Sequence, residues 1–539
     1  MPSEPLEAEF AFPPALTRHQ EDEYRVLDRE GPIPLSPRST RHSTVVANAS
    51  GNVSITDLEK QFQDEGVRVV SFEKGVGEDP REWGLGKKWY ITGSTSFLCL
   101  AVALGSSIIT GDIEGPVKEF NTTQEIVNLT VTCFVIGFGV GPLLFAPLSE
   151  VFGRKPIYCL SMFLYFIFTL PSALSKNVAT LVVCRQIAGI AASAPMCNVG
   201  GTVADIWRVE DRGIPMAVFS GTLFLGPCVG PLVGGWIGER VGWRWIYWVL
   251  FIFVGFSFAL TLFIPETLAP VLLRRKAEKL RKETGDPSYQ SLAELEHEPF
   301  STTLKIAVAR PLVMLFTEPL ILLFTIYLSF IYSILYLLFF AFPLAFIEVR
   351  GFGLGITGTT FISIMLGIAA ALAVLPYQER IYARVTADGT FPEARLYPMM
   401  VGAIILPSAL FIFAFTGGYK QVHWIGVCAA GTVFGFAMIV IYVSANSYIV
   451  DSYSNYAASA IAAKTFLRSI VGAMIPLFVT QMFHGMGFQY AGLLLALVAC
   501  AIGPLPYVFF IYGEQVRSRS KMASQARRGE GCVEKDIPH

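Results

Sequence analysis

The sequence predicts an all-α membrane protein whose twelve transmembrane helices form two pseudo-symmetric six-helix bundles. Three observations lead to this prediction. The chain of 539 residues is 53% hydrophobic and only 15% charged, which is more apolar and less charged than a typical soluble domain. It contains about twelve apolar runs of roughly the ~20 residues that a helix needs to cross a hydrocarbon core about 30 Å thick. A short repeat also relates its two halves.

The apolar runs divide the chain into five parts. We expect a disordered cytosolic tail at 1–88, an N-terminal bundle at 89–264, a cytosolic linker at 265–317, a C-terminal bundle at 318–512 and a second cytosolic tail at 513–539. Half of the spans lie on each side of the linker. The expected spans are 90–111, 126–148, 157–174, 179–201, 214–238, 243–264, 318–341, 356–376, 396–416, 424–447, 458–482 and 488–512.

A polar segment precedes the first expected span. Residues 1–75 are rich in Pro, Ser, Glu and Arg, a composition typical of a solvated tail. Residues 1–88 contain no apolar core followed by a cleavage site, so we expect no cleavable signal peptide. Loops assigned to the inside hold about 15 basic residues and those assigned to the outside about six. This bias predicts that both termini lie in the cytosol.

The linker contains a basic amphipathic segment. The stretch PVLLRRKAEKLRKETG, from Pro270, places leucine or alanine at 272, 273, 277 and 280 opposite a basic face. This pattern is typical of a helix that lies in the plane of a membrane surface. We therefore expect an interfacial helix on the cytosolic side.

A hairpin between the second and third spans recurs in the second half. The first copy reads PLSEVFGRK from Pro147 and the second reads PYQERIYAR from Pro376, so that a proline, a glutamate and a terminal base recur at an offset of 229 residues. The match falls where a duplicated six-span unit would place it. Two equivalent bundles imply a cavity between them that opens alternately to either side, which favours a secondary transporter.

The fifth span carries GTLFLGPCVGPLVGG at 221–235, in which Gly226, Gly230 and Gly234 are spaced four apart. In lipid, small residues at helical spacing allow two helix backbones to approach closely. Two prolines beside this stripe bend the helix and remove backbone donors. An ordinary packing face of small residues is the alternative interpretation.

This stretch resembles the span-five antiporter motif of the major facilitator superfamily, and therefore implies the major facilitator fold. PLSEVFGRK resembles the loop signature between spans two and three of that superfamily, with Glu150 where aspartate is usual, and LVVCRQIAGIAASAP resembles its span-four signature, with Arg185 in the arginine position. The residues that match the antiporter motif are Gly221, Gly226, Pro227, Gly230, Gly234 and Gly235.

The segments 79–89, 265–286 and 446–478 are similar to the fungal twelve-span drug:proton antiporters, a group that includes multidrug and polyamine efflux proteins. The resemblance covers about 79–519. It implies proton-driven export of small molecules from the cytosol, usually across the plasma membrane, with the vacuolar membrane as the alternative.

A candidate proton-coupling site lies near the outer side. Arg185 is about two turns into span four, at a depth where an unpaired guanidinium costs ~2.5 kcal/mol or more. Asp112 and Glu114 follow span one at the same outer level, so we expect one of them to pair with Arg185. Protonation of that carboxylate would release the arginine. A fixed structural ion pair is the alternative.

A candidate inner gate lies at the opposite ends of the spans. We expect Glu150 to accept hydrogen bonds from the amides that open span eleven, and Arg154 to pair with Asp205. Both contacts would exist only when the inner ends of the two bundles meet, and a solvated loop cluster is the alternative. Arg468 forms a basic pair with Lys464 on span eleven, near Asp451 of span ten. We interpret this pair as part of the inner gate or as an anchor.

A candidate substrate cavity is defined by polar aromatic residues. Tyr332 and Tyr336 are four apart on span seven, and Tyr442 and Asn446 are four apart on span ten. Tyrosine offers flat apolar area and one polar group, which suits bulky amphipathic compounds. Packing between helices is the alternative.

Catalytic and cofactor sites are not expected. No G-x-x-x-x-G-K-[ST], H-E-x-x-H or G-x-S-x-G sequence is present, so we predict neither an enzyme nor an ATP-driven pump. The cysteines of the spans lack C-x-x-C spacing and resemble packing residues, so that no metal or other cofactor is expected. The expected partners are a small-molecule substrate, protons and the lipid bilayer. We expect a monomer that binds no nucleic acid.

Three functions remain in competition. Polyamine export requires desolvated carboxylates along the pathway, but the acids of the spans lie almost wholly at span ends. We therefore favour export of lipophilic or weakly cationic drugs and toxins. An importer of small solutes with the same fold is the third possibility, because the PET sequence at 265–267 also occurs in sugar carriers.

Overall fold

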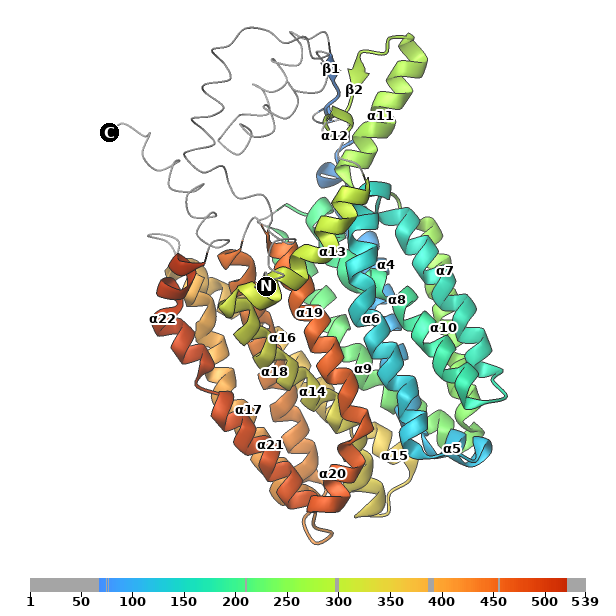
Figure 1. The fold of residues 1–539 in the computed structure, drawn as a ribbon, viewed down its shortest axis with the longest axis vertical. Coiled ribbons are helices and arrows are strands. Elements are labelled where there is room, and N and C mark those ends of the chain that lie inside the picture. The colour runs from blue at the N-terminus through green and yellow to red at the C-terminus, as the bar shows by residue number, and fades with distance from the viewer. Residues whose placement is uncertain are drawn as a thin grey trace, which may run out of the picture. The chain divides into compact units, whose positions relative to one another are not determined.

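The computed structural model describes residues 67–520, apart from 74, 76, 209–210, 296–299, 386–391 and 454–455. In these residues, 12 helical segments are long and apolar enough to cross a membrane. Figure 1 shows long helices that run roughly side by side. This confirms the predicted fold class. The greater part of both predicted tails, 1–66 and 521–539, lies outside the described residues. Below, the inner end of a span is the end that the sequence assigns to the cytosol, and the outer end is the opposite one.

The first bundle contains the first six spans of the described chain. The short helix α5 (Glu114–Phe120) follows the first span at its outer end. The spans are α4 (Leu85–Ser107) continued by η2 (Ile108–Gly111), α6 (Gln124–Phe152), α7 (Arg154–Ala173), α8 (Val178–Ile206), α9 (Gly213–Val241) and α10 (Trp243–Phe263).

The second bundle contains the other six spans, and several of them consist of successive helices. It ends later than the predicted boundary at 512, because its last helix continues to Arg519. The spans are α14 (Pro319–Pro343) with η4 (Leu344–Glu348), α15 (Leu354–Thr359) with α16 (Ile362–Val385), η5 (Pro392–Leu396) with α17 (Tyr397–Gly417), α18 (Ile425–Ser452), α19 (Ala457–Met474) with η7 (Ile475–Leu477), and α21 (Phe488–Ile502) with α22 (Leu505–Arg519). The short helix α20 (Val479–Met486) precedes the last span.

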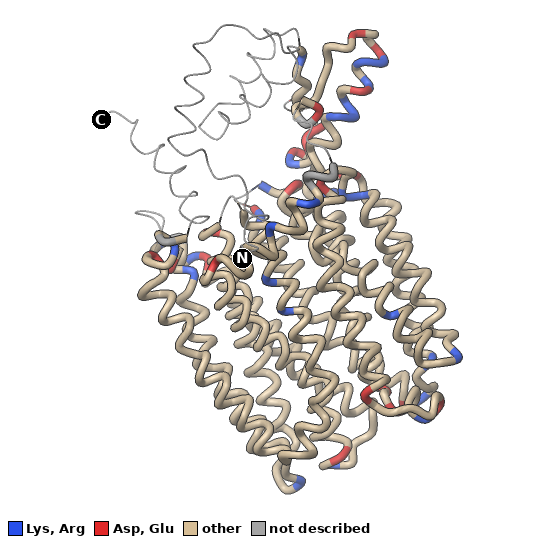
Figure 2. The backbone as a smooth tube through the Cα atoms, in the orientation of Figure 1, with Lys and Arg blue, Asp and Glu red and all other residues tan. Residues whose placement is uncertain are grey.

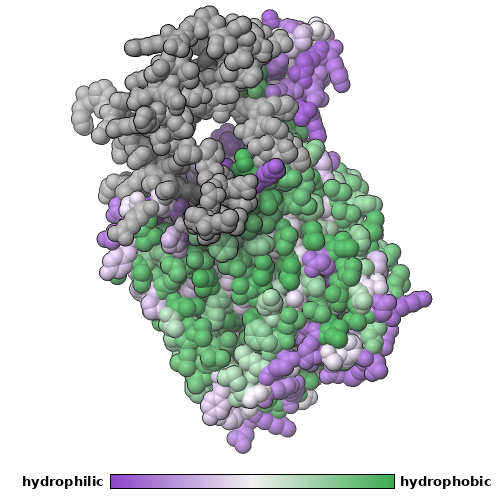
Figure 3. Space-filling view, in the orientation of Figure 1, coloured by the Kyte–Doolittle hydropathy of each residue, from purple (hydrophilic) through white to green (hydrophobic). Residues whose placement is uncertain are grey.

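The surface of the spans is apolar. Figure 2 shows charged residues gathered toward the two ends of the spans, and Figure 3 shows a broad hydrophobic face between those ends. On α10, for example, Ile252 and Phe256 are 64% and 56% exposed. A surface of this kind is unfavourable in water and stable in lipid. The fold is therefore that of a multi-pass membrane protein.

The two bundles are built from the same set of helix contacts. In the first bundle α4 packs on α9, α6 on α8, α7 on α8 and α7 on α10. In the second bundle the spans six places later repeat these contacts: α14 packs on α19, α16 on α18, α17 on α18 and α17 on α21. The contacts between bundles follow the same rule, because α9 packs on α15 and α16, and α19 packs on α6. This agreement supports a duplicated six-span unit.

Residues that precede the first span pair with the linker. β1 (Arg68–Val69) forms a parallel pair with β2 (Tyr289–Gln290), in the register Arg68 to Tyr289. The turn η1 (Pro80–Glu82) follows, and the first helix begins at Leu85. The prediction of a disordered tail as far as 88 is therefore wrong for the described residues between 67 and 88. The cause is a pairing partner more than 200 residues away, which local composition does not reveal.

The basic amphipathic helix exists but is oriented differently from the prediction. α11 (Ala269–Thr284) packs on β2 and on the short helix α12 (Leu292–Leu295), and Figure 1 shows it extending away from the ends of the spans. Its cations have protein partners: Lys276 Nζ lies 2.6 Å from Glu78 Oε2, and Arg281 Nη2 lies 2.9 Å from Glu294 Oε1. The first pair holds the helix against the segment before the first span, and the second holds it against α12. The prediction that it lies along the membrane surface is therefore wrong.

The second part of the linker runs across the inner ends of the spans. α13 (Phe300–Thr317) contacts α6 of the first bundle and α19 of the second. The linker therefore connects the two bundles covalently and also contacts both of them through α13.

Candidate functional site

The glycine stripe of α9 packs on the first span. A Cβ atom at Gly226, Gly230 or Gly234 would overlap Ala103, Ser107 or the carbonyl of Ile108, respectively. Each of these neighbours belongs to α4 or η2. The close approach of two backbones that the spacing predicts is therefore present.

A proline of the motif leaves one backbone carbonyl of α9 without its helical donor, and the first span supplies a donor to it. Pro231 has no N–H, so the carbonyl four residues before it, that of Pro227, lacks its helical donor. The Ser107 hydroxyl donates to this carbonyl at 2.7 Å. The stripe thus combines close contact with a hydrogen bond that satisfies a buried acceptor.

The first and the last glycine of the motif face the second bundle. A Cβ at Gly235 would lie 2.6 Å from the carbonyl of Leu354, and a Cβ at Gly221 would lie 2.9 Å from the Leu372 side chain. Leu354 opens α15 and Leu372 lies on α16. α9 therefore contacts its own bundle through one row of small residues and the opposite bundle through others.

Hydrogen bonds join the bundles toward their outer ends. The Asn128 amide donates to the carbonyl of Pro476 at 2.7 Å, and the Thr132 hydroxyl donates to that of Ala473 at 2.8 Å. Where α9 meets α15, the Glu239 carboxylate accepts a hydrogen bond from the backbone amide of Gly355. We call these three hydrogen bonds the outer contacts. They hold the outer ends of the bundles together in this conformation.

Arg185 lies in the core of the first bundle, and its predicted partners are wrong. It is 1% exposed. Its guanidinium donates to the carbonyl of Gly105 and lies 4.1 Å from the ring centre of Phe134. Among the described residues no carboxylate pairs with it, because Gly105 precedes Asp112 by seven residues, or ~10 Å along a helix. Arg185 therefore meets span one too deep to reach Asp112 or Glu114.

Asp112 and Glu114 occupy different environments. The Asp112 side chain is buried against Gly238 of α9, and its Oδ1 accepts from the amide of Gly115 at 2.9 Å. This burial raises the pKa of the Asp112 carboxyl above its ordinary value, although the hydrogen bond opposes the shift. Glu114 is 75% exposed and pairs with Lys118 at 2.7 Å. Only Asp112 has the environment of a group that binds a proton readily.

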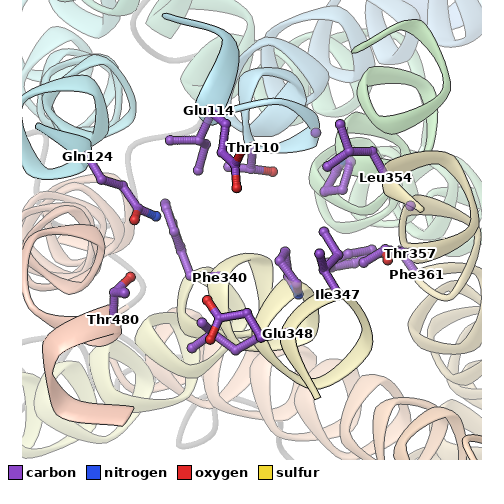
Figure 4. Close-up of a pocket in the computed structure, with 16 residues that line it drawn as sticks. Thr110, Glu114, Gln124, Phe340, Ile347, Glu348, Leu354, Thr357, Phe361 and Thr480 are labelled. Carbon is purple, nitrogen blue, oxygen red and sulfur yellow. The ribbon is translucent and has the colours of Figure 1, made fainter. Parts of the chain in front are cut away.

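A pocket at the outer ends contains carboxylates from both bundles. Figure 4 shows Glu114 and Glu348 pointing into it from opposite sides, with Gln124 and Thr480 beside them. Glu348 also lies 2.8 Å from Nε2 of His484. Sequence reasoning did not place Glu348 in the same pocket as Glu114, since the two residues are far apart in the chain.

The inner charge cluster is partly as predicted. Arg154 Nε lies 3.3 Å from Asp205 Oδ2, and its Nη1 donates to the Ser149 hydroxyl at 2.7 Å. Both partners belong to the first bundle, so this pair does not depend on contact between the bundles. The prediction that it exists only when the inner ends of the bundles meet is therefore wrong. Glu150 is exposed, and no hydrogen bond or ion pair joins it to a described residue of α19. The predicted bond to the amides of span eleven is absent from this conformation.

A buried carboxylate at the inner end was missed by sequence reasoning. Glu266, which follows α10, is 4% exposed. Its Oε1 accepts from the amides of Arg154, Thr267 and Leu268 at 2.9, 3.0 and 3.1 Å, and its Oε2 accepts from that of Lys155 at 3.2 Å. It thereby satisfies amides at the start of α7, where an anion is favourable. The PET sequence at 265–267 contains this residue, but spacing alone does not indicate its partner.

The second bundle has a corresponding inner cluster. Arg395 Nε lies 3.1 Å from Asp451 Oδ2, and Arg395 Nη1 lies 2.7 Å from Glu379 Oε2. Asp451 is next to the last residue of α18, just as Asp205 is next to the last residue of α8. Asp451 is therefore not the partner of Lys464 and Arg468, contrary to the expectation from the sequence.

The predicted cavity residues meet at the interface between the bundles. We call them, together with the two cations of α19, the central cluster; it consists of Tyr332, Tyr336, Tyr442, Asn446, Lys464 and Arg468. Arg468 Nη1 donates to the Tyr442 hydroxyl at 2.6 Å and its guanidinium lies 4.1 Å from the ring centre of Tyr332. The assignment of Arg468 to the inner gate is wrong, because this side chain turns toward the tyrosines.

The central cluster is packed against the first bundle in this conformation. The Tyr336 hydroxyl donates to that of Ser106 at 3.1 Å, and the rings of Tyr442 and Phe224 lie 4.6 Å apart. All three tyrosines are buried. The residues predicted to line a cavity are thus brought together, but here they form a closed polar cluster instead of the wall of an open cavity.

Two quasi-equivalent bundles that meet along an interface with buried polar groups are an architecture found in many transporters. A family model described as Major Facilitator Superfamily matches residues 95–476, and the chain belongs to this superfamily. It is accordingly a transporter of small molecules and not an enzyme.

Three relatives illustrate the similarity. The MFS-type transporter paaT of Penicillium rubens is 45% identical over 463 residues, which cover 85% of this chain and 84% of that protein. Efflux pump FUBT of Fusarium oxysporum is 38% identical, with 91% of this chain and 84% of that protein covered. Polyamine transporter 3 of Saccharomyces cerevisiae is 39% identical, with 87% and 76% covered. These relatives agree with the resemblance to fungal drug:proton antiporters.

Proposed function

We propose that this chain exports lipophilic small molecules, such as drugs and toxins, from the cytosol in exchange for protons. The observation that carries the proposal is the glycine and proline stripe of α9, which resembles the antiporter motif and packs on the first span. Because α9 also contacts the second bundle, a change at its contact with the first span can alter the contact between bundles. The name of the Fusarium relative, an efflux pump, agrees with export.

Alternating access requires the outer contacts to break as the outer side opens. The two neutral hydrogen bonds contribute only ~1 kcal/mol each, and the one to the Glu239 carboxylate contributes about 1.5–3 kcal/mol, so together they favour one state without locking it. In the opposite state the inner ends of the bundles meet. Glu150, which is exposed at the inner end of α6, is our candidate for the contact with span eleven in that state.

Asp112 is our candidate for the proton-binding group. It lies beside Gly238 of α9, next to the contact that joins the first and fifth spans. Release of the proton leaves a buried charge, which favours a conformation in which water reaches the carboxylate. Protonation of Asp112 would therefore favour the packed outer end, and its deprotonation would favour an open one.

The charges of the interface favour lipophilic over cationic substrates. In the described spans the carboxylates lie near span ends, whereas Lys464 and Arg468 are buried in the central cluster. These cations repel a positively charged substrate. The sequence predicts lipophilic or weakly cationic substrates. Of these, we therefore propose the lipophilic compounds that carry no positive charge.

We also propose that the protein is a monomer in the plasma membrane with both termini in the cytosol. The excess of basic residues in the loops assigned to the inside supports this orientation. The vacuolar membrane is the alternative location.

Transport by the purified protein in proteoliposomes tests the proposal. A fluorescent lipophilic dye would be compared with spermidine, with and without an imposed pH gradient. We expect the dye to move against its gradient only when protons move in the opposite direction. Dye movement that is indifferent to the pH gradient would contradict proton antiport.

Polyamine export is the second candidate function, because one relative is named Polyamine transporter 3. It requires a polycation to pass the buried cations of the central cluster, which is unfavourable. Gradient-driven flux of spermidine without flux of the dye would favour polyamine export over our proposal. Movement of solute in the same direction as protons would favour an importer.

A further inference from the structure

The central cluster holds two buried positive charges whose partners are neutral. Lys464 and Arg468 are 1% and 3% exposed and lie four residues apart on α19. The Tyr442 hydroxyl accepts from Arg468 at 2.6 Å and from Lys464 at 3.3 Å, and the Asn446 amide oxygen also accepts from Lys464. The Nε of Arg468 has no hydrogen-bond partner among the described residues.

No ion pair within the described chain neutralises these charges. The acid of α18, Asp451, pairs with Arg395 instead. Two like charges on adjacent helical turns repel each other, and each also loses its hydration on burial. Hydrogen bonds from a hydroxyl and an amide offset only part of this penalty. The cluster is therefore an arrangement that an anion would stabilise.

The geometry of the donors suits a carboxylate. A guanidinium offers a planar pair of donors to a carboxylate, and an ammonium group adds a point charge. The surrounding rings of Tyr332, Tyr336 and Phe224 provide apolar area at the same place. The site lies on the interface between the bundles, where alternating access exposes it to each side in turn.

We propose that the central cluster binds the carboxylate of a lipophilic organic acid, with Lys464 and Arg468 as its charge partners. The proposal rests on the proposed function, because it names the substrate class for the transport described there. The carboxylate takes hydrogen bonds that now go to Tyr442 and Asn446, and the apolar body of the acid packs on the rings.

Binding to the purified full-length protein in detergent tests this site without requiring transport. Isothermal titration calorimetry at neutral pH would compare naphthalene-2-carboxylate with naphthalene-2-carboxamide, which has a similar shape and no charge. We expect the carboxylate to bind at least about tenfold more tightly, because hydrogen bonds between charged groups are stronger than neutral ones. Equal affinities, tighter binding of the carboxamide or no measurable binding of the carboxylate would overturn the proposal.

Variants assign the charge preference to the cluster. Lys464→Gln and Arg468→Gln should each weaken carboxylate binding about tenfold and leave carboxamide binding unchanged. Lys464→Arg, which keeps the charge, should retain most of the carboxylate affinity. Lys176→Gln removes an exposed cation at the opposite bundle's outer end and serves as the control. If the cluster variants lose affinity for the carboxylate and the carboxamide equally, the two side chains act through packing and the assignment is overturned.

Thermal unfolding separates loss of the site from loss of the fold. Removal of an uncompensated buried charge should not lower the midpoint of unfolding. Naphthalene-2-carboxylate should raise the midpoint of the wild type more than that of Lys464→Gln or Arg468→Gln. An equal ligand-induced shift in all three proteins would place the ligand elsewhere and overturn the proposal.

Failure of this inference and failure of the proposed function give different results. If proteoliposomes show no gradient-driven transport while charge-selective binding persists in the detergent-purified protein, the proposed function fails and the site stands. If transport is gradient-driven and the two naphthalene compounds bind equally, the site fails and the proposed function stands.

Discussion

Gly230 lies where the fifth span crosses the first. A Cβ atom at this position would overlap the Ser107 hydroxyl and lie 2.9 Å from the backbone nitrogen of Ile108. A change of rotamer at Ser107 does not remove the second conflict, because the nitrogen belongs to the backbone. Glycine is therefore required at this position because the two helices lie very close together, and not because the backbone adopts an unusual φ angle.

Gly230→Ala should destabilise the protein by about 1–3 kcal/mol, since the extra methyl group forces the two spans apart. We also expect loss of gradient-driven dye export. The midpoint of thermal unfolding and the proteoliposome assay would measure the two effects. Gly213→Ala is the matched control, because nothing lies within 4 Å of a Cβ at that position of the same helix. A decrease of the same size in both variants would contradict this packing argument.

Asp112→Asn mimics the protonated carboxyl and should abolish gradient-driven export while leaving downhill exchange of substrate intact. Burial raises the pKa of Asp112 in the folded protein. The stability that this residue contributes is therefore fully present below the ordinary pKa of aspartate and is lost as the pH rises through the raised pKa. Unfolding midpoints measured across this pH range should fall further in the wild type than in Asp112→Asn.

The corresponding change at the exposed neighbour, Glu114→Gln, is the control for that experiment. It should leave both gradient-driven export and the pH dependence of stability close to those of the wild type, because its carboxylate is 75% exposed. Full gradient-driven export by Asp112→Asn would exclude Asp112 as the coupling group.

At the scale of elements, the start of α7 depends on a carboxylate from another part of the chain. Gly153, with φ of +100°, ends α6 and turns the chain into α7. Glu266 then accepts hydrogen bonds from the amides of Arg154 and Lys155. The first amides of a helix have no partner within the helix, so Glu266 connects the end of the sixth span to the beginning of the third.

Glu266→Gln should lower the stability of the protein by about 1–2 kcal/mol, because it removes a buried negative charge from a helix N-terminus. The midpoint of thermal unfolding of the purified protein would measure this loss. Glu283→Gln is the control, since Glu283 is 57% exposed in an ion pair on α11 and such pairs contribute little. A midpoint unchanged by Glu266→Gln would show that the amides find other acceptors.

At the scale of the whole molecule, equivalent lines of contact join the two bundles. α6 packs on α19, and α9 packs on α15 and α16, which are the second, eleventh, fifth and eighth spans. The outer contacts lie on these lines. Since each line pairs one span of the first bundle with one of the second, a rocking motion can open both at one end without disrupting the packing inside either bundle.

Thr132→Val should shift the population toward molecules that are open at the outer side. The change preserves shape and removes a hydrogen bond between bundles worth ~1 kcal/mol, which corresponds to about a fivefold change in the equilibrium. Pulsed electron paramagnetic resonance would measure distances between labels at Lys118 and Lys420, in a chain with its native cysteines replaced. We expect a larger fraction of long distances.

Thr169→Val is the matched control for the conformational experiment. The Thr169 hydroxyl donates to the carbonyl of Tyr165 in its own helix at 2.7 Å, so its loss should not change the distance distribution. Identical distributions for Thr132→Val and the wild type would mean that this hydrogen bond does not favour the closed outer side.

The transmembrane organisation followed from the sequence because hydropathy and helical length are local properties. The stripe of Gly226, Gly230 and Gly234 was predictable for the same reason, since residues four apart share a helix face. The pair between Arg154 and Asp205 was also predicted, because both residues lie at inner span ends. Local sequence pattern was sufficient for the first two predictions, and depth along the membrane normal was sufficient for the third.

For the other charged side chains, the tertiary structure alone decided which of them meet. Arg185 contacts the carbonyl of Gly105 instead of Asp112, Asp451 pairs with Arg395 instead of Lys464, and Arg468 turns toward the tyrosines. Glu266 found its partners at the start of another helix. These outcomes depend on the rotation of each helix about its axis and on differences in depth of one or two turns. Hydropathy determines neither quantity, because both are set by packing between helices.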